Sequence, residues 1–259
     1  APRLPEGISS EDLRRLQRFY DMSPEYPRVD WEEGLAHLPV SEIIENQQGP
    51  QGIYEDMIKR KPNDPAWYAG GLYNDDMVLA VPSFWFCSWY DVSITPNLAL
   101  FNHARENATP DVRDHQYLFI APTLHCRYTR ATENTIVGER SVGDARYDYD
   151  GLIYGWFDYW LKGEKNDILE TPRVTYYTMG SNKWQTAKQW PPEASKLETY
   201  YLDSEGGANS LYGNGKLTTT MPETDRPDSF TYDPHNPIMS YGGNVCCTGN
   251  AVEGGSFDQ

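Results

Sequence analysis

Residues 77–91, MVLAVPSFWFCSWYD, and residues 116–126, QYLFIAPTLHC, decide the fold class of this chain. Each stretch contains a nearly continuous apolar run, typical of a strand that is buried on both faces. A helical segment, ITPNLALFNHAREN, lies between them, and an amphipathic segment, DYDGLIYGWFDYWLKGEKN, follows. Strand, helix, strand and helix in this order predict parallel strands joined by helical crossovers, and hence an α/β fold.

Three stretches are predicted to differ in structure. Residues 1–74 contain short helical segments with proline-rich joints and are interpreted as a helical cap; the first helix begins near Ser9 or Ser10, which can cap it. Residues 75–167 form the C-terminal part of an α/β domain. Residues 168–259 hold short alternating segments (PRVTYYTMG, KLETYYLD, GKLTTTM and DSFTYD) between turn residues, a pattern typical of a β-sandwich or jelly roll.

The helix predicted within residues 148–166 has a clear apolar face and a clear end. Its apolar face comprises Leu152, Trp156, Tyr159 and Trp160. Gly163 is suited to the position after the last helical residue.

Composition excludes some classes of function. The chain has 259 residues, of which 39% are apolar and 14% aromatic, so it can build a sizeable core and is not a disordered protein. Its 22 basic and 38 acidic residues give a net charge of −16, which disfavours nucleic acid as a partner because phosphates would be repelled. No apolar run reaches the length of a membrane-spanning helix, so we expect no membrane partner.

We expect neither a metal nor another cofactor. None of the four cysteines has C-x-x-C spacing, and the acidic residues of 144–150 do not follow the spacing of an EF-hand loop. A disulfide between Cys87 and Cys126 is an open alternative to two free thiols.

Asp91 and His125 are the candidate catalytic residues. Each directly follows one of the two apolar strands, and they are 34 positions apart, about the length of one βαβ unit. Functional side chains of parallel sheets lie beyond the carboxyl ends of the strands. A carboxylate there can fix the tautomer of the imidazole, which can then take a proton from a nucleophile. The alternatives are an Asp91 that caps the following helix and a His125 that is an ordinary loop histidine.

Three aromatic residues near Asp91 are candidates for substrate binding: Trp85, Trp89 and Tyr90. Packing in the core is the alternative for all three. The acids of VDWEE and IYEDM could meet a substrate ammonium group, but a solvated helix face explains them better.

From Trp67 to the end, the sequence resembles the family of X-prolyl dipeptidyl peptidases, cocaine esterase and α-amino-acid ester hydrolases, the CocE/NonD hydrolases. The matching segments, in colinear order, are DPAWY (64–68), VPSFWFCSWYD (81–91), LFIAPTLHC (118–126), VGDARYDY (142–149), WFDYWLKGE (156–164), PRVTYYTMGSNKWQTAKQWPP (172–192) and YDPHNPIMSYGGNVC (232–246).

The resemblance implies an α/β-hydrolase domain with a helical cap, followed by a β jelly roll. It implies that Asp91 and His125 are the acid and the base of a Ser-His-Asp triad. The substrate class it implies is a small-molecule ester or amide or a peptide: X-Pro dipeptides, amino-acid esters, acyl side chains of β-lactams, or aromatic esters.

This sequence departs from the family pattern in two ways. Ser88 stands where the family has a glycine before Trp-Tyr-Asp, and no Gly-x-Ser-x-Gly segment is present to supply the nucleophile. GERSVGD (138–144) has the wrong spacing and follows the histidine. We therefore expect the serine outside this chain, either in a longer protein or on a partner chain or homo-oligomer. Alternative functions are a carbohydrate-binding jelly roll without catalysis and one subunit of a processed acylase.

Overall fold

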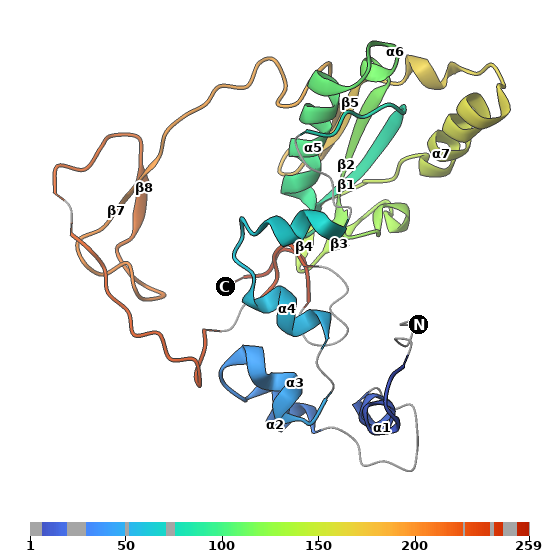
Figure 1. The fold of residues 1–259 in the computed structure, drawn as a ribbon. Helices are drawn as coiled ribbons and strands as arrows, with labels where there is room; N and C mark the ends of the chain where they lie inside the picture. Colours follow the sequence, from blue (N-terminus) through green and yellow to red (C-terminus); the bar gives the residue numbers. More distant parts are fainter. Residues whose placement is uncertain are drawn as a thin grey trace. The chain divides into compact units, whose positions relative to one another are not determined.

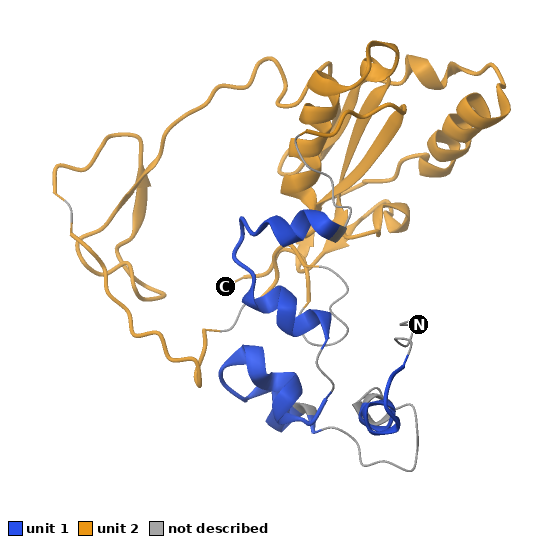
Figure 2. Cartoon of the chain, viewed as in Figure 1, with its two compact units in different colours: residues 1–74 blue, residues 75–259 orange. Residues whose placement is uncertain are grey.

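The computed structural model describes residues 7–19, 30–49, 52–70, 76–224, 226–238, 241–245 and 253–258. The chain divides into two compact units, Ala1–Asn74 and Asp75–Gln259, which Figure 2 colours separately. Of the matching segment YDPHNPIMSYGGNVC (232–246), residues Met239, Ser240 and Cys246 lie outside the described residues.

The first unit is helical, as expected. Its α-helices are α1 (Ser10–Phe19), α2 (Trp31–Leu35), α3 (Ile43–Asn46) and α4 (Ile53–Lys59), with 3₁₀ turns at Val40–Glu42 and Pro65–Gly70. The Ser9 hydroxyl oxygen accepts a hydrogen bond from the Asp12 backbone N–H at 3.0 Å, which satisfies an otherwise unpaired donor at the start of α1. Whether this unit acts as a cap remains a prediction.

The second unit is built on a four-stranded sheet in the order β1–β2–β5–β6, of which Figure 1 labels the first three strands. Its strands are β1 (Ser83–Tyr90), β2 (Gln116–Leu124), β5 (Val174–Thr178) and β6 (Lys183–Ala187). β1, β2 and β5 run parallel, as expected for the first two, and β6 is antiparallel to β5. The connection between β1 and β2 contains α5 (Ile94–Asn107) and α6 (Pro110–Arg113).

Helices cover both faces of this sheet (Figure 1). Alternate residues of β2 point to opposite faces, so each face carries apolar side chains that a helix buries. Leu118 and Ile120 pack with Ile94 and Phe101 of α5. On the other face, β2 packs against α7 (Tyr149–Phe157), which a π-helical turn (Asp158–Lys162) extends. The predicted apolar face of this helix is confirmed, since Trp156 belongs to a buried cluster and the partly buried Leu152, Tyr159 and Trp160 pack against it. Gly163 ends it with a φ of 72°, a left-handed conformation that favours glycine.

The first strand differs from its prediction. β1 begins only at Ser83, and Met77, Val78 and Val81 are exposed. Pro82, which lacks a backbone N–H, directly precedes the strand. β1 is also the edge of the described sheet, so most of its residues are half-buried, whereas all but the last residue of β2 are buried.

The assignment of residues 174–187 to a β-sandwich is wrong. β5 pairs with β2, from Leu118 opposite Val174 to Ile120 opposite Tyr176, so the α/β sheet continues to Ala187. Alternation predicted a strand here but could not predict its partner. Beyond it, β7 (Tyr201–Asp203) and β8 (Lys216–Thr218) form a separate antiparallel pair, and DSFTYD forms no strand.

Two short strands follow β2: β3 (Ile136–Val137) and β4 (Arg140–Ser141) pair with each other. Among the described residues, no helix is long and apolar enough to cross a membrane. Cys87 and Cys126 are free thiols, which contradicts the alternative of a disulfide between them.

Candidate active site

The two candidate catalytic residues follow the ends of neighbouring parallel strands. β1 ends at Tyr90 and β2 ends at Leu124, and these two residues are paired across the strands. The next residue of each strand is therefore the candidate acid, Asp91, or the candidate base, His125. The sheet thus places both groups at one edge, as the sequence predicts.

A bulge in β2 sets this pairing. Ser88 pairs with Ala121, but Tyr90 pairs with Leu124, so β2 has one more residue than β1 over this interval. Without the extra residue, Asp91 would lie opposite Leu124, and His125 would be displaced by one position. The interval contains Pro122, which has no N–H to donate to a ladder and is tolerated at bulges.

Asp91 and His125 are in direct contact. The His125 Nδ1 atom lies 2.8 Å from the Asp91 Oδ2 atom. The Asp91 side chain is 9% exposed and the imidazole 31% exposed. His125 Nε2 makes no hydrogen bond to any residue that the structure describes, and in a Ser-His-Asp triad this nitrogen is the one that faces the nucleophile.

The carboxylate of Asp91 is held ionised by its neighbours. Burial raises its pKa, but hydrogen bonds from the Ser93 hydroxyl and backbone N–H, and then from His125, outweigh burial and bring the pKa below its ordinary value. The Asp91 Oδ1 atom accepts from the Ser93 backbone N–H at 2.8 Å and from the Ser93 hydroxyl at 2.7 Å. One carboxylate oxygen therefore faces Ser93 and the other faces the imidazole.

The alternative in which Asp91 caps the following helix does not fit this geometry. The N-cap residue of α5 is Ser93, and the Asp91 side chain accepts no hydrogen bond from a residue within α5 among the described contacts.

A buried hydroxyl pair joins the two strands just before the site. The hydroxyls of Ser88 and Thr123 are 3.1 Å apart, and the two residues are 1% and 4% exposed. In the sequence, Ser88 stands out only as a departure from the family's glycine. Two small polar residues near the ends of adjacent apolar strands were the available signal for this pair.

The three aromatic candidates for substrate binding have structural partners. The Trp85 indole donates to the Gln116 side chain at 3.1 Å, near the opposite end of the sheet from His125. The Trp89 indole donates to the Tyr177 carbonyl at 2.6 Å and packs on Trp190, and Tyr90 packs on the cluster around Val142. These contacts resemble core packing, and substrate binding by the three residues stays a prediction.

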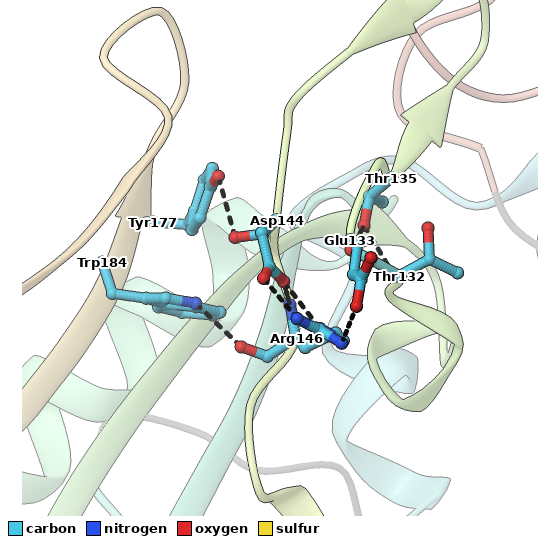
Figure 3. Close-up of polar contacts among 7 residues, drawn as sticks. All are labelled: Thr132, Glu133, Thr135, Asp144, Arg146, Tyr177 and Trp184. Carbon is cyan, nitrogen blue, oxygen red and sulfur yellow. Dashed lines mark hydrogen bonds and ion pairs between the residues drawn. The ribbon is translucent and has the colours of Figure 1, made fainter.

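The loop after His125 is tied to β5 and β6 (Figure 3). The Tyr177 hydroxyl donates to the Val142 carbonyl at 2.6 Å and lies 3.3 Å from the Asp144 carbonyl, and the Trp184 indole donates to the Arg146 carbonyl at 3.2 Å. The Arg146 guanidinium pairs with Asp144 and Glu133, and Arg146 holds the pKa of Asp144 below its ordinary value. This chain segment thus links the His125 region to the strands that sequence reasoning had placed in another domain.

Known proteins match this chain in sequence. The model of the X-Pro dipeptidyl-peptidase C-terminal non-catalytic domain matches residues 166–254. Cocaine esterase of Rhodococcus sp. (strain MB1 Bresler) is 26% identical over 193 residues, which cover 74% of this chain and 32% of that protein. These matches support the resemblance to the CocE/NonD-type hydrolases.

Two solved structures match this chain in part. An aminopeptidase from the marine sediment archaeon Thaumarchaeota archaeon superposes with a TM-score of 0.50 at 22% identity, covering 68% of this chain and 27% of its own; this likeness concerns the fold. A CocE/NonD family hydrolase of Staphylococcus aureus has a TM-score of 0.39 at 17% identity, covering 62% of this chain and 26% of its own. The chain spans about a third of the length of cocaine esterase.

Proposed function

We propose that this chain supplies the acid and the base of a serine hydrolase that cleaves esters or amides. The observation that carries the proposal is the 2.8 Å contact between Asp91 Oδ2 and His125 Nδ1 at the ends of adjacent parallel strands. The relationship to cocaine esterase supports this class of reaction.

In this mechanism each residue has one role. Asp91, ionised and buried, accepts a hydrogen bond from the His125 Nδ1–H, and this holds the tautomer in which Nε2 carries no proton. Nε2 then takes the proton of a serine hydroxyl as that oxygen attacks the substrate carbonyl, and returns it to the leaving group. The substrate class is a small-molecule ester or amide, or a peptide with an X-Pro dipeptide.

The serine would come from outside these 259 residues, which contain no Gly-x-Ser-x-Gly segment. The free edge of β1 is a suitable place for the strand that carries it. β1 is the outer strand of the described sheet, has eight residues, and ends at the residue before Asp91. A parallel strand paired there would end beside the imidazole.

We also propose that β7 and β8 belong to a β jelly roll. The match of residues 166–254 to a C-terminal non-catalytic domain supports this assignment, as do the exposed side chains of Leu202 and Leu217, which further strands would bury.

The proposal is tested by His125→Ala in the full-length protein. We expect the variant to lose ester hydrolysis by at least about 10³-fold in kcat/KM, because no general base remains. His235→Ala, at an exposed loop histidine, is the matched control and should keep full activity. Unchanged hydrolysis in His125→Ala would refute the proposed function. Glycan affinity without labelling by a fluorophosphonate would favour the binding-module alternative.

A further inference from the structure

Ser93 occupies a position where serine usually has a different role. It is the N-cap residue of α5, and a serine there commonly accepts a hydrogen bond from a backbone N–H of the first helical turn. In this structure the Ser93 side chain makes no capping hydrogen bond. Its hydroxyl instead lies 2.7 Å from the Asp91 Oδ1 atom. The usual stabilisation of the helix end therefore does not explain this side chain.

Asn97 determines the direction of the Ser93 hydroxyl. The side-chain amide of Asn97, one turn further along α5, donates to the Ser93 Oγ atom at 3.3 Å. A hydroxyl has a single hydrogen to donate and two lone pairs. Because the amide uses a lone pair, the hydroxyl hydrogen stays available for the Asp91 carboxylate. The result is a chain of hydrogen bonds in which Asn97 donates to Ser93 and Ser93 donates to Asp91, whose other oxygen accepts from the His125 Nδ1–H.

We propose that Ser93 is a positioning residue, which fixes the plane of the Asp91 carboxylate so that Oδ2 faces the Nδ1 atom of His125. This inference rests on the proposed function. The torsion that turns a carboxylate about its last bond is soft, so one hydrogen bond does not define the plane well. The Ser93 N–H and hydroxyl together hold Oδ1 from two directions at 2.8 and 2.7 Å. Removing the hydroxyl leaves the backbone contact alone.

The test compares two isosteric variants of the full-length protein. Ser93→Thr keeps the hydroxyl. Ser93→Val has the same shape as the threonine variant but carries a methyl group in place of the hydroxyl. We expect Ser93→Val to lower kcat by about 10-fold to 100-fold with KM unchanged, because the misdirected carboxylate no longer orients the base. Ser93→Thr should keep kcat within about twofold of the wild type. Ser181→Ala, which removes an exposed hydroxyl from the turn between β5 and β6, should have no effect.

A spectroscopic measurement makes the test independent of the serine nucleophile. The Nδ1–H proton of His125, hydrogen-bonded to Asp91, should give a strongly downfield proton NMR signal. The signal should be present in the wild type and in Ser93→Thr, and should broaden or move upfield in Ser93→Val. An unchanged signal and an unchanged kcat in Ser93→Val would overturn the inference. If His125→Ala refuted the proposed function, the NMR comparison would still decide whether Ser93 orients Asp91.

Discussion

At the scale of single residues, the candidate site depends on a carboxylate that stays ionised although it is buried. Transfer of Asp91 from water disfavours its charge, and the donors of Ser93 and His125 restore it. Arg146 shows the contrast. Its ion pairs with Asp144 and Glu133 are exposed to solvent, where such pairs contribute little to stability. Hydrogen bonds and ion pairs to a carboxylate therefore matter more for stability at the buried Asp91 than at the exposed Asp144 and Glu133.

The lowered pKa of Asp91 predicts how its contribution to stability depends on pH. A carboxylate with a folded-state pKa below its ordinary value of 3.8 stabilises the protein above that value, and this contribution is lost as the pH falls through the folded-state pKa. Asp91→Asn lacks the contribution at every pH. We therefore expect the wild type to be more stable than the variant at pH 7, and the difference to shrink towards pH 3.

Chemical unfolding of both proteins at the two pH values measures this. Asp228→Asn is a suitable comparison, because this carboxylate is exposed but also accepts hydrogen bonds, from the Ser204 hydroxyl and the Ala208 N–H. A gap between wild type and Asp91→Asn that widened with acid would show that burial, and not hydrogen bonding, dominates at Asp91.

At this scale the sequence predicts which residues form the candidate site, but it does not predict the hydrogen bonds that hold them. An acid and a histidine that each follow an apolar run predicted a shared edge, and the resemblance assigned their roles. Ser93 carries no comparable signal, because a serine before a helix predicts a cap. Thr123 is a signal only together with Ser88, because a single threonine inside an apolar strand predicts a packed residue.

At the scale of elements, a single bulge in β2 determines whether Asp91 and His125 lie next to each other at the ends of their strands. The side chains of a strand alternate with a period of two, so a shift by one residue exchanges the faces. The extra residue of β2 lies between the pairs Ser88–Ala121 and Tyr90–Leu124. The hydroxyl pair of Ser88 and Thr123 lies within this interval and joins the two strands where their register changes.

We predict energetic coupling between these two hydroxyls. Ser88→Ala alone leaves the buried Thr123 hydroxyl without its partner and should lower the free energy of unfolding by about 1–3 kcal/mol. Thr123→Val should have a similar effect. The double variant should be less destabilised than the sum of the single changes, by about 1 kcal/mol. Urea unfolding followed by tryptophan fluorescence measures all four proteins.

The control cycle combines Ser88→Ala with Ser181→Ala, whose hydroxyl contacts the Thr178 carbonyl in another part of the sheet. Its two changes should be additive. Additivity in the Ser88 and Thr123 cycle as well would mean that the hydroxyl pair does not join the strands.

Helices were easier to predict than strand partners. The ends of α1 and of the helix that stops at Gly163 follow from a capping serine and from a glycine with positive φ. β5 and β6 were identified as strands but placed in the wrong sheet. β6 is an antiparallel edge strand on an otherwise parallel sheet, and its alternation does not distinguish it from a strand of a β-sandwich.

At the scale of the whole molecule, the sequence match and the strand pairing place the end of the α/β domain at different residues. The match to the C-terminal non-catalytic domain begins at residue 166, close to the predicted boundary at residue 168. Strand pairing carries the α/β sheet through to Ala187. Residue pattern alone could not resolve this, because a strand's place in a sheet depends on hydrogen bonds to residues that are distant in sequence.

The last prediction concerns the chain taken by itself. The Asp91–His125 pair can activate only a hydroxyl within hydrogen-bonding reach of Nε2, and in the described part of the chain no serine hydroxyl contacts that atom. The 259-residue chain alone should therefore neither hydrolyse an aryl ester nor react with a fluorophosphonate probe. The full-length protein should do both, and should lose both in His125→Ala. Labelling of the isolated chain, followed by identification of the modified serine by mass spectrometry, would instead locate the nucleophile within these residues and contradict a serine supplied across the edge of β1.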